Sequence, residues 1–166
     1  MIRALLFTCL LLLGACASQA PLPASVPHLQ LPMQLHIQRQ QADQRQDWLL
    51  VIQQENAGLR WSLMDPLGIP LARQRLIDGK WQADGLLPPN AEARELFAAL
   101  LLALTPDAEL PATYPSTQRR GTQRILYARW GVEYRSADSF RLSVKTAPDQ
   151  ARLSYGVSPL SNGGTP

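Results

Sequence analysis

The residue with the clearest chemistry in this sequence is Cys16, which ends the stretch "LGAC". A Leu, two small residues and a Cys form the lipobox pattern, in which the Cys is acylated and becomes the new N-terminus. The stretch follows Arg3 and an apolar segment, residues 4–13, that is too short to span a bilayer permanently. We therefore predict residues 1–15 to be a lipoprotein signal peptide and Cys16 to be the lipidation site. The alternative is an ordinary secretory signal with an incidental Cys.

An acylated Cys16 has consequences for location and stability. Several acyl chains hold a protein on a membrane almost permanently, and Ala17 favours sorting to the outer membrane. We expect a lipid-anchored protein on the periplasmic face of that membrane. The second cysteine, Cys9, lies inside the predicted signal peptide, so the mature chain would have neither a free thiol nor a disulfide.

Other residues that could do chemistry do not form a recognisable catalytic set. There are two histidines, His28 and His36, and no spacing typical of a metal site. The acidic pair Asp43 and Asp47 is typical of a turn, and "GxSxG", "HExxH" and glycine-rich phosphate loops are absent from the sequence. We predict a non-enzymatic binder or carrier with no cofactor and no metal, because a hydrolase would lack its residues. A net charge of +3 is too small to indicate a nucleic-acid partner.

Alternating apolar and polar residues predict the elements that must position any site. Four strand-like segments come first, separated by the turn signals "ENAG", "DPLG" and "DGK". The pattern then changes to helical spacing in "AEARELFAALLLAL", with Asn90 as the cap and Pro106 after the end. Further strands follow, the last of them at an edge. The predicted strands are 33–40, 47–53, 59–64, 69–77, 122–130, 132–135, 140–144 and 152–155.

Strands on both sides of one helix predict an α+β fold with a curved antiparallel sheet, an open or incomplete β-barrel wrapped around a covering helix. The domain would cover residues 33–157, after a Pro-rich tether at 16–32 and before a flexible tail at 158–166.

Apolar and aromatic side chains on these elements could line a ligand cavity or fill an ordinary core, and the pattern does not separate the two. The candidates for a cavity are Trp48, Leu50, Ile52, Trp61, Leu63, Leu96, Phe97, Leu100, Leu101, Tyr127, Phe140 and Leu142.

Arginines also gather in the C-terminal half. They would either lie on a solvated strand face or contact an anionic headgroup or an acidic partner. They are Arg119, Arg120, Arg124, Arg129, Arg135 and Arg141.

The turn "DPLG" carries an unexpected large residue, Leu67, at its tip. With the lipobox, the Pro66–Gly68 turn between strands and the later helix, the chain resembles LolB, the outer-membrane receptor that accepts lipoproteins from the periplasmic carrier LolA. The resemblance implies an open barrel with an apolar cavity. It also implies that Leu67 contacts the membrane and helps transfer cargo, and that a periplasmic carrier protein is a partner.

The Gln-rich start and "LTPDAELPATYP" are more similar to uncharacterised small lipoproteins associated with aryl-polyene (xanthomonadin-like) biosynthesis. Two functions follow from these observations. The first is a carrier or receptor for a lipid or an acylated cargo, with aryl-polyene-type lipids as one cargo that the resemblance implies. The second is a structural lipoprotein that scaffolds an envelope complex. In both, the side chain of Leu67 lies either in solvent or folded back on Trp61 or Ile69.

Overall fold

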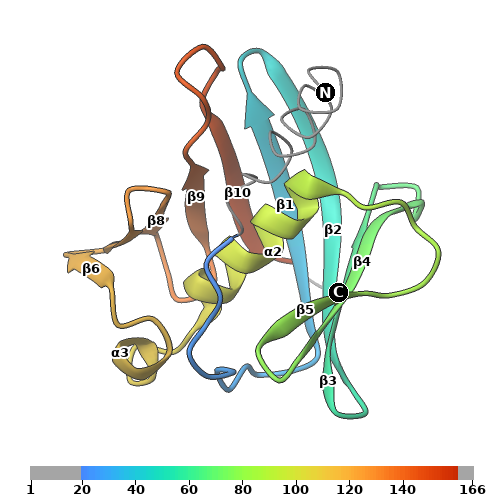
Figure 1. Ribbon diagram of the computed structural model, residues 1–166. Helices are drawn as coiled ribbons and strands as arrows, with labels where there is room; N and C mark the ends of the chain where they lie inside the picture. The colour runs from blue at the N-terminus through green and yellow to red at the C-terminus, as the bar shows by residue number, and fades with distance from the viewer. Residues whose placement is uncertain (1–19, 161–166) are drawn as a thin grey trace, which may run out of the picture.

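The computed structural model describes residues 20–160, so Cys16 and the predicted signal peptide lie outside the described residues. In this part the chain forms ten strands and the helices α2 and α3 (Figure 1). The elements in order are β1 (Met33–Gln41), β2 (Gln44–Glu55), β3 (Gly58–Met64), β4 (Pro70–Ile77), β5 (Lys80–Ala83), α2 (Ala91–Leu104), α3 (Leu110–Thr113), β6 (Thr117–Arg120), β7 (Gln123–Leu126), β8 (Trp130–Tyr134), β9 (Phe140–Val144) and β10 (Leu153–Pro159).

All ten strands form one antiparallel sheet in the order β5-β4-β3-β2-β1-β10-β9-β8-β7-β6. The sheet is open, because β5 and β6 are its two outer strands within the described residues. The prediction of an open antiparallel sheet with a helix is therefore confirmed. The prediction that the last strand lies at an edge of the sheet is wrong. β10 pairs with β1 from Leu35↔Pro159 to Gln41↔Leu153 and lies at the centre of the sheet.

The first four predicted strands are correct to within a few residues, whereas the short strands were not predicted. β5 and β6 have four residues each, too few to show an alternating pattern. The predicted strand 122–130 is interrupted by a turn in which Tyr127 and Ala128 both have a φ of 51°. Neither residue type favours this left-handed conformation, so the turn between β7 and β8 has no sequence signal.

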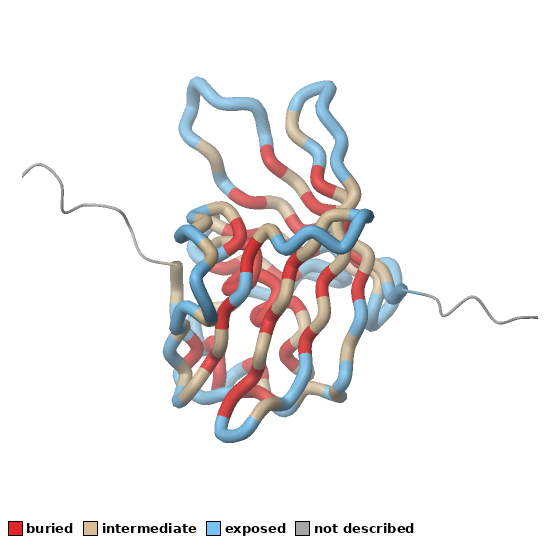
Figure 2. The backbone as a smooth tube through the Cα atoms, turned by 90° about the vertical axis from the view of Figure 1, so that its right-hand side faces the viewer, coloured by how far each residue is buried: buried red, intermediate tan, exposed pale blue. Residues whose placement is uncertain are grey.

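Helix α2 forms where the sequence predicts it and crosses the inner face of the sheet (Figure 1). Nine of its residues are buried, on all sides of the helix. The strands contribute alternate residues to the same core, such as Leu35 and Ile37 from β1 and Leu50 and Ile52 from β2, and Figure 2 shows this alternation along the tube. Each such Leu or Ile contributes about 1.5–3 kcal/mol by leaving water.

Residues 20–32, most of the predicted tether, lie against the domain. Pro23 and Pro27 are buried, and Leu29 and Leu31 pack against the core. The N–H of Ala24 donates to the carbonyl of Thr113 at 2.9 Å. This segment thus adds apolar cover beside α3. At the other end, β10 continues to Pro159, two residues into the predicted tail.

Candidate ligand-binding cleft

Most of the predicted cavity residues lie together in one buried core. These are Leu50, Ile52, Trp61, Leu63, Leu96, Phe97, Leu100, Leu101, Phe140 and Leu142. Trp48 is half-buried and packs at the edge of this core. Tyr127 is different, since its side chain is 67 % exposed and its hydroxyl donates to Ser116 at 2.9 Å. Tyr127 lies outside the core because the β7–β8 turn directs it outward.

Leu67 is in solvent, at 85 % exposure, so it does not fold back on Trp61. The turn that carries it is closed by backbone hydrogen bonds from Gly68 to Asp65 and from Asp65 to Ile69, both 3.0 Å. Gly68 has a φ of 82°, which glycine adopts without strain. The adjacent Ile69 is also exposed.

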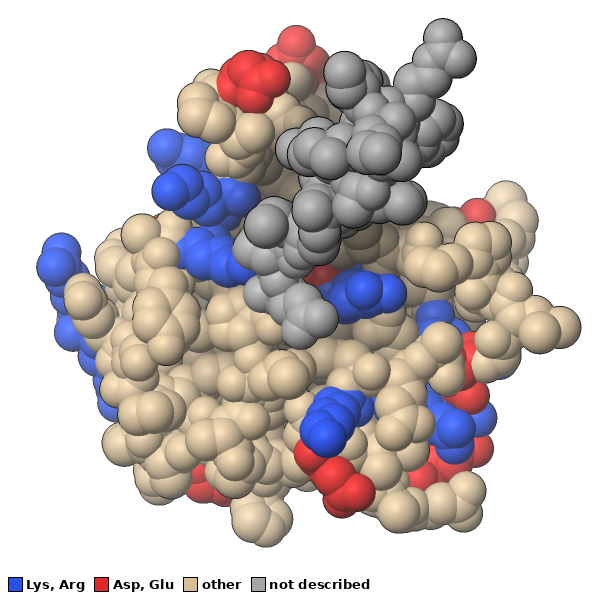
Figure 3. Space-filling model, viewed as in Figure 1, with Lys and Arg blue, Asp and Glu red and all other residues tan. Residues whose placement is uncertain are grey.

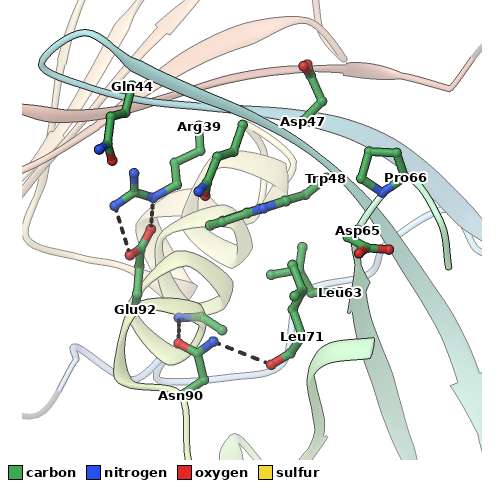
Figure 4. Close-up of a pocket in the computed structure, with 12 residues that line it drawn as sticks. Arg39, Gln44, Asp47, Trp48, Leu63, Asp65, Pro66, Leu71, Asn90 and Glu92 are labelled. Atoms are coloured by element: carbon green, nitrogen blue, oxygen red, sulfur yellow. Dashed lines mark hydrogen bonds and ion pairs between the residues drawn. The ribbon is translucent and has the colours of Figure 1, made fainter. Parts of the chain in front are cut away.

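A cleft of about 670 Å³ lies at the N-terminal end of α2, beside this turn (Figure 4). Strands β1 and β2 form one side of the cleft, and the β3–β4 turn and the start of α2 form the other. The lining residues are Arg39, Gln44, Gln46, Asp47, Trp48, Leu63, Asp65, Pro66, Leu71, Asn90, Glu92 and Ala93. Of the predicted cavity residues, only Trp48 and Leu63 belong to this lining. The turn that presents Leu67 is part of the cleft rim through Asp65 and Pro66.

An ion pair forms the polar end of the cleft. The guanidinium of Arg39 donates to Glu92 from Nε at 2.6 Å and from Nη2 at 3.1 Å. The Tyr155 hydroxyl donates to the same carboxylate at 2.8 Å. The hydrogen bond to Glu92 raises the pKa of Arg39 above its usual value, although burial acts in the opposite direction. Burial, reinforced by the negative charge of Glu92, also raises the pKa of Tyr155. Both groups therefore keep their protons at neutral pH.

The apolar side of the cleft depends on a β-bulge. Leu63 pairs with Ala72 and Met64 pairs with Pro70, so Leu71 has no partner on β3. Bulges of this kind redirect a side chain and free its backbone groups. The carbonyl of Leu71 accepts from Asn90 Nδ2 at 3.4 Å, while Asn90 Oδ1 caps α2 by accepting from the N–H of Ala93 at 3.0 Å. Asn90 thus joins the helix to the cleft wall.

His36 and Asp47 bind each other in the structure. His36 Nε2 lies 2.8 Å from Asp47 Oδ1, and Gln38 also donates to Asp47. Burial acts to raise the pKa of Asp47, but these hydrogen bonds outweigh it and lower the pKa. The Asp47 side chain points away from the cleft (Figure 4). Residues 20–160 contain no group of three or more His, Cys, Asp or Glu side chains that could hold a metal ion.

The arginines of the C-terminal half differ in their exposure. Arg119, Arg120, Arg135 and Arg141 are exposed, and Figure 3 shows Lys and Arg gathering at the side of the molecule where β6 lies. Arg124 is buried instead. Its Nη1 donates to the carbonyls of Leu102 at 2.9 Å and Thr105 at 2.7 Å, and its Nη2 donates to Asp107 at 2.5 Å. Arg124 therefore completes the C-terminal end of α2.

The second ion pair on α2 lies away from the cleft. Glu95 accepts from Arg129 Nε at 2.7 Å and Nη2 at 2.6 Å, and from Trp130 Nε1 at 2.6 Å. Glu92 and Glu95 both lie near the start of α2, but the sequence gave no signal for their arginine partners, which come from elements distant in the sequence. Arg39 was missed for this reason.

Comparison with known proteins places the chain in a sequence family. The model of a family described as "Protein of unknown function (DUF3261)" matches residues 30–155, more than half of the chain. No curated protein matches the sequence. Among the described residues, no helix is both long enough and apolar enough to cross a membrane.

Proposed function

The chain belongs to the DUF3261 family, and we propose that it is an outer-membrane lipoprotein that binds or transfers a lipid or an acylated cargo. In this proposal Cys16 carries the acyl anchor, the described domain faces the periplasm, and the protein has no catalytic role. The open sheet and its crossing helix support a LolB-like architecture, with a periplasmic carrier protein as the partner that delivers cargo.

The observation that carries the proposal is the cleft together with the turn at its rim, which exposes Leu67. Its volume of about 670 Å³ is in the range of pockets that enclose small ligands, about 300–1,000 Å³. One side is apolar, formed by Trp48, Leu63, Pro66 and Leu71, and the other end is polar. A site with these two ends suits an amphiphile. In the proposal, Leu67, which is exposed on the adjoining turn, enters the bilayer from which such a ligand would come.

Native mass spectrometry tests the proposal. The protein would be residues 16–166 with Cys16→Ser, which removes the acylation site and keeps every described residue. Purified from cells without added lipid, it should carry bound lipid, or take up a one-to-one equivalent of an added single-chain lipid. A protein that neither retains nor takes up lipid, with its secondary structure intact, would contradict the carrier function.

The same preparation tests the alternative of a scaffold. A scaffold would retain a stoichiometric protein partner in the spectrum and no lipid. Metabolic labelling of the full chain with radioactive palmitate tests the anchor separately, because label should appear in the native chain and be absent from a Cys16→Ala variant.

A further inference from the structure

The cleft contains few charges that a ligand could neutralise. We propose that it accepts an amphiphile whose polar group is an uncharged carbonyl, an ester or an amide, and that it discriminates against an anionic headgroup. This inference rests on the proposed function, since it concerns the ligand of the same cleft.

The one cation of the cleft already has an anion. Arg39 is the only Lys or Arg in the lining, and Glu92 holds it by two hydrogen bonds of 2.6 and 3.1 Å. Because Arg39 is buried, this pairing offsets most of the cost of removing its charge from water. A ligand carboxylate or phosphate near Arg39 would also lie near Glu92. It would have to displace that carboxylate or be repelled by it.

The other feature that attracts anions, the helix N-terminus, is occupied as well. Asn90 Oδ1 takes the N–H of Ala93, and Glu92 places a negative charge in the first turn of α2. These groups offset part of the positive end of the helix dipole. The remaining charged groups of the lining are Asp47 and Asp65, both acidic. Because the Asp47 side chain points away from the cleft, the charged groups left in the lining are the Arg39 guanidinium and the carboxylates of Glu92 and Asp65, which together oppose an anionic ligand.

A cationic ligand gains little from these carboxylates, because each has partners within the protein. Asp65 accepts from the backbone N–H groups of Leu67 and Ile69, and Asp47 is bonded to His36 and Gln38. An uncharged group is not repelled by Glu92, and it does not have to compete for carboxylates that already have partners. It has donors available, namely the side-chain amides of Gln44 and Gln46 and Nη1 of Arg39, which has no hydrogen-bond partner in residues 20–160. A carbonyl oxygen is the matching acceptor.

Three ligands with equal C12 chains test the proposal: monolaurin (a glycerol ester), laurate (a carboxylate) and dodecyltrimethylammonium (a cation). Residues 16–166 with Cys16→Ser would be titrated below each critical micelle concentration, with binding read by native mass spectrometry and Trp fluorescence. We expect monolaurin to bind about tenfold more tightly than laurate or the cation. If laurate or the cation binds as tightly as monolaurin, the inference is wrong while the proposed function stands. If none of the three binds, the inference is wrong, and the proposed function fails as well when the purified protein also carries no lipid.

A substitution that removes the negative charge of Glu92 tests the role of the ion pair. Glu92→Gln keeps the size and an acceptor oxygen for Arg39 but leaves the guanidinium charge unbalanced. Laurate should then bind about tenfold more tightly than it binds the parent protein, and its disadvantage against monolaurin should disappear. Glu95→Gln is the matched control, because Glu95 is on the same helix in a similar pair with Arg129 and does not line the cleft. An unchanged ratio in a folded Glu92→Gln protein would overturn the assignment. If that variant does not fold, the comparison of ligands on the parent protein still decides.

Discussion

The Asp65 carboxylate accepts hydrogen bonds from the backbone N–H of Leu67 at 2.9 Å and from that of Ile69 at 2.8 Å. One side chain thus organises the turn between β3 and β4 and holds it in a defined shape. Because the backbone is fixed in this way, the Leu67 side chain stays exposed and does not collapse onto the core. An apolar group held in water in this way costs free energy unless it meets another apolar surface.

Replacing Leu67 should therefore change membrane binding and leave stability unchanged. Leu67→Glu removes no core contact, so we expect the free energy of unfolding to change by less than about 0.5 kcal/mol. Binding of the unacylated domain to phospholipid vesicles should weaken more than tenfold, since inserting a Leu contributes about 1.5–3 kcal/mol. Urea denaturation and vesicle co-sedimentation measure the two effects.

Two variants control for this experiment. Leu67→Met keeps an apolar tip and should retain vesicle binding. Leu22→Glu introduces the same charge at an exposed Leu beside α3, away from the cleft lining, and should affect vesicle binding less than Leu67→Glu. If Leu22→Glu loses as much vesicle binding as Leu67→Glu, then the added negative charge, and not the position on the turn, explains the result.

Arg124 should matter far more to stability than its neighbours. Its guanidinium satisfies carbonyls at the C-terminal end of α2, which contains no basic residue in its last turn. Arg124→Ala would leave these buried acceptors without partners, and we expect a loss of about 2–4 kcal/mol in urea denaturation. Arg124→Lys should recover only part of this, because an ammonium group cannot donate in the same forked geometry. Arg120→Ala, at an exposed position of β6, should cost less than about 0.5 kcal/mol.

The sequence predicts the local elements well, because their signals are local. The helical spacing of Leu96, Phe97 and Leu100, together with Asn90 before the helix, was enough to place α2. The alternation in residues 33–40 and 59–64 was enough to place β1 and β3. Such patterns are read within a few residues and depend only on which side of an element faces the core.

The cleft could not be predicted in the same way, because it depends on residues that are distant in sequence. Arg39 and Glu92 are 53 positions apart, and the pairing of β10 with β1 joins the two ends of the domain. The bulge at Leu71 follows from how β3 and β4 align, which the residue types do not reveal. Core and cleft residues are equally apolar in the sequence. Trp48 could therefore not be distinguished from Leu50, although the first lines the cleft and the second is fully buried.

Acid should weaken the domain partly through Asp107. The hydrogen bond from Arg124 lowers the pKa of Asp107 below its ordinary value of 3.8, although burial acts in the opposite direction. The folded state thus favours the ionised carboxylate, and this stabilisation is present above about pH 4 and is lost as the pH falls through the lowered pKa. Because the Asp107 side chain is more than half exposed, its contribution should be about 1 kcal/mol or less.

The measurement for Asp107 is a comparison of two proteins across pH. The difference in unfolding free energy between the parent protein and Asp107→Asn should be largest near neutral pH. It should shrink as the pH falls below about 4, where the parent carboxyl also becomes protonated. A difference that stays constant down to pH 2 would show that the ion pair with Arg124 is not the origin of the effect.

Asn90 should link helix stability to ligand binding, because it contacts both α2 and the cleft wall. Asn90→Ala removes the cap on Ala93 and the donor to the Leu71 carbonyl, and should cost about 1–2 kcal/mol in urea denaturation. Asn90→Asp keeps the capping oxygen and loses only the donor, so it should keep most of the stability. Both variants leave Leu71 free to move at its bulge, so both should bind monolaurin less tightly than the parent protein. If Asn90→Asp binds as tightly as the parent protein, the hydrogen bond to Leu71 does not shape the cleft, and the loss in Asn90→Ala would come from the helix end alone.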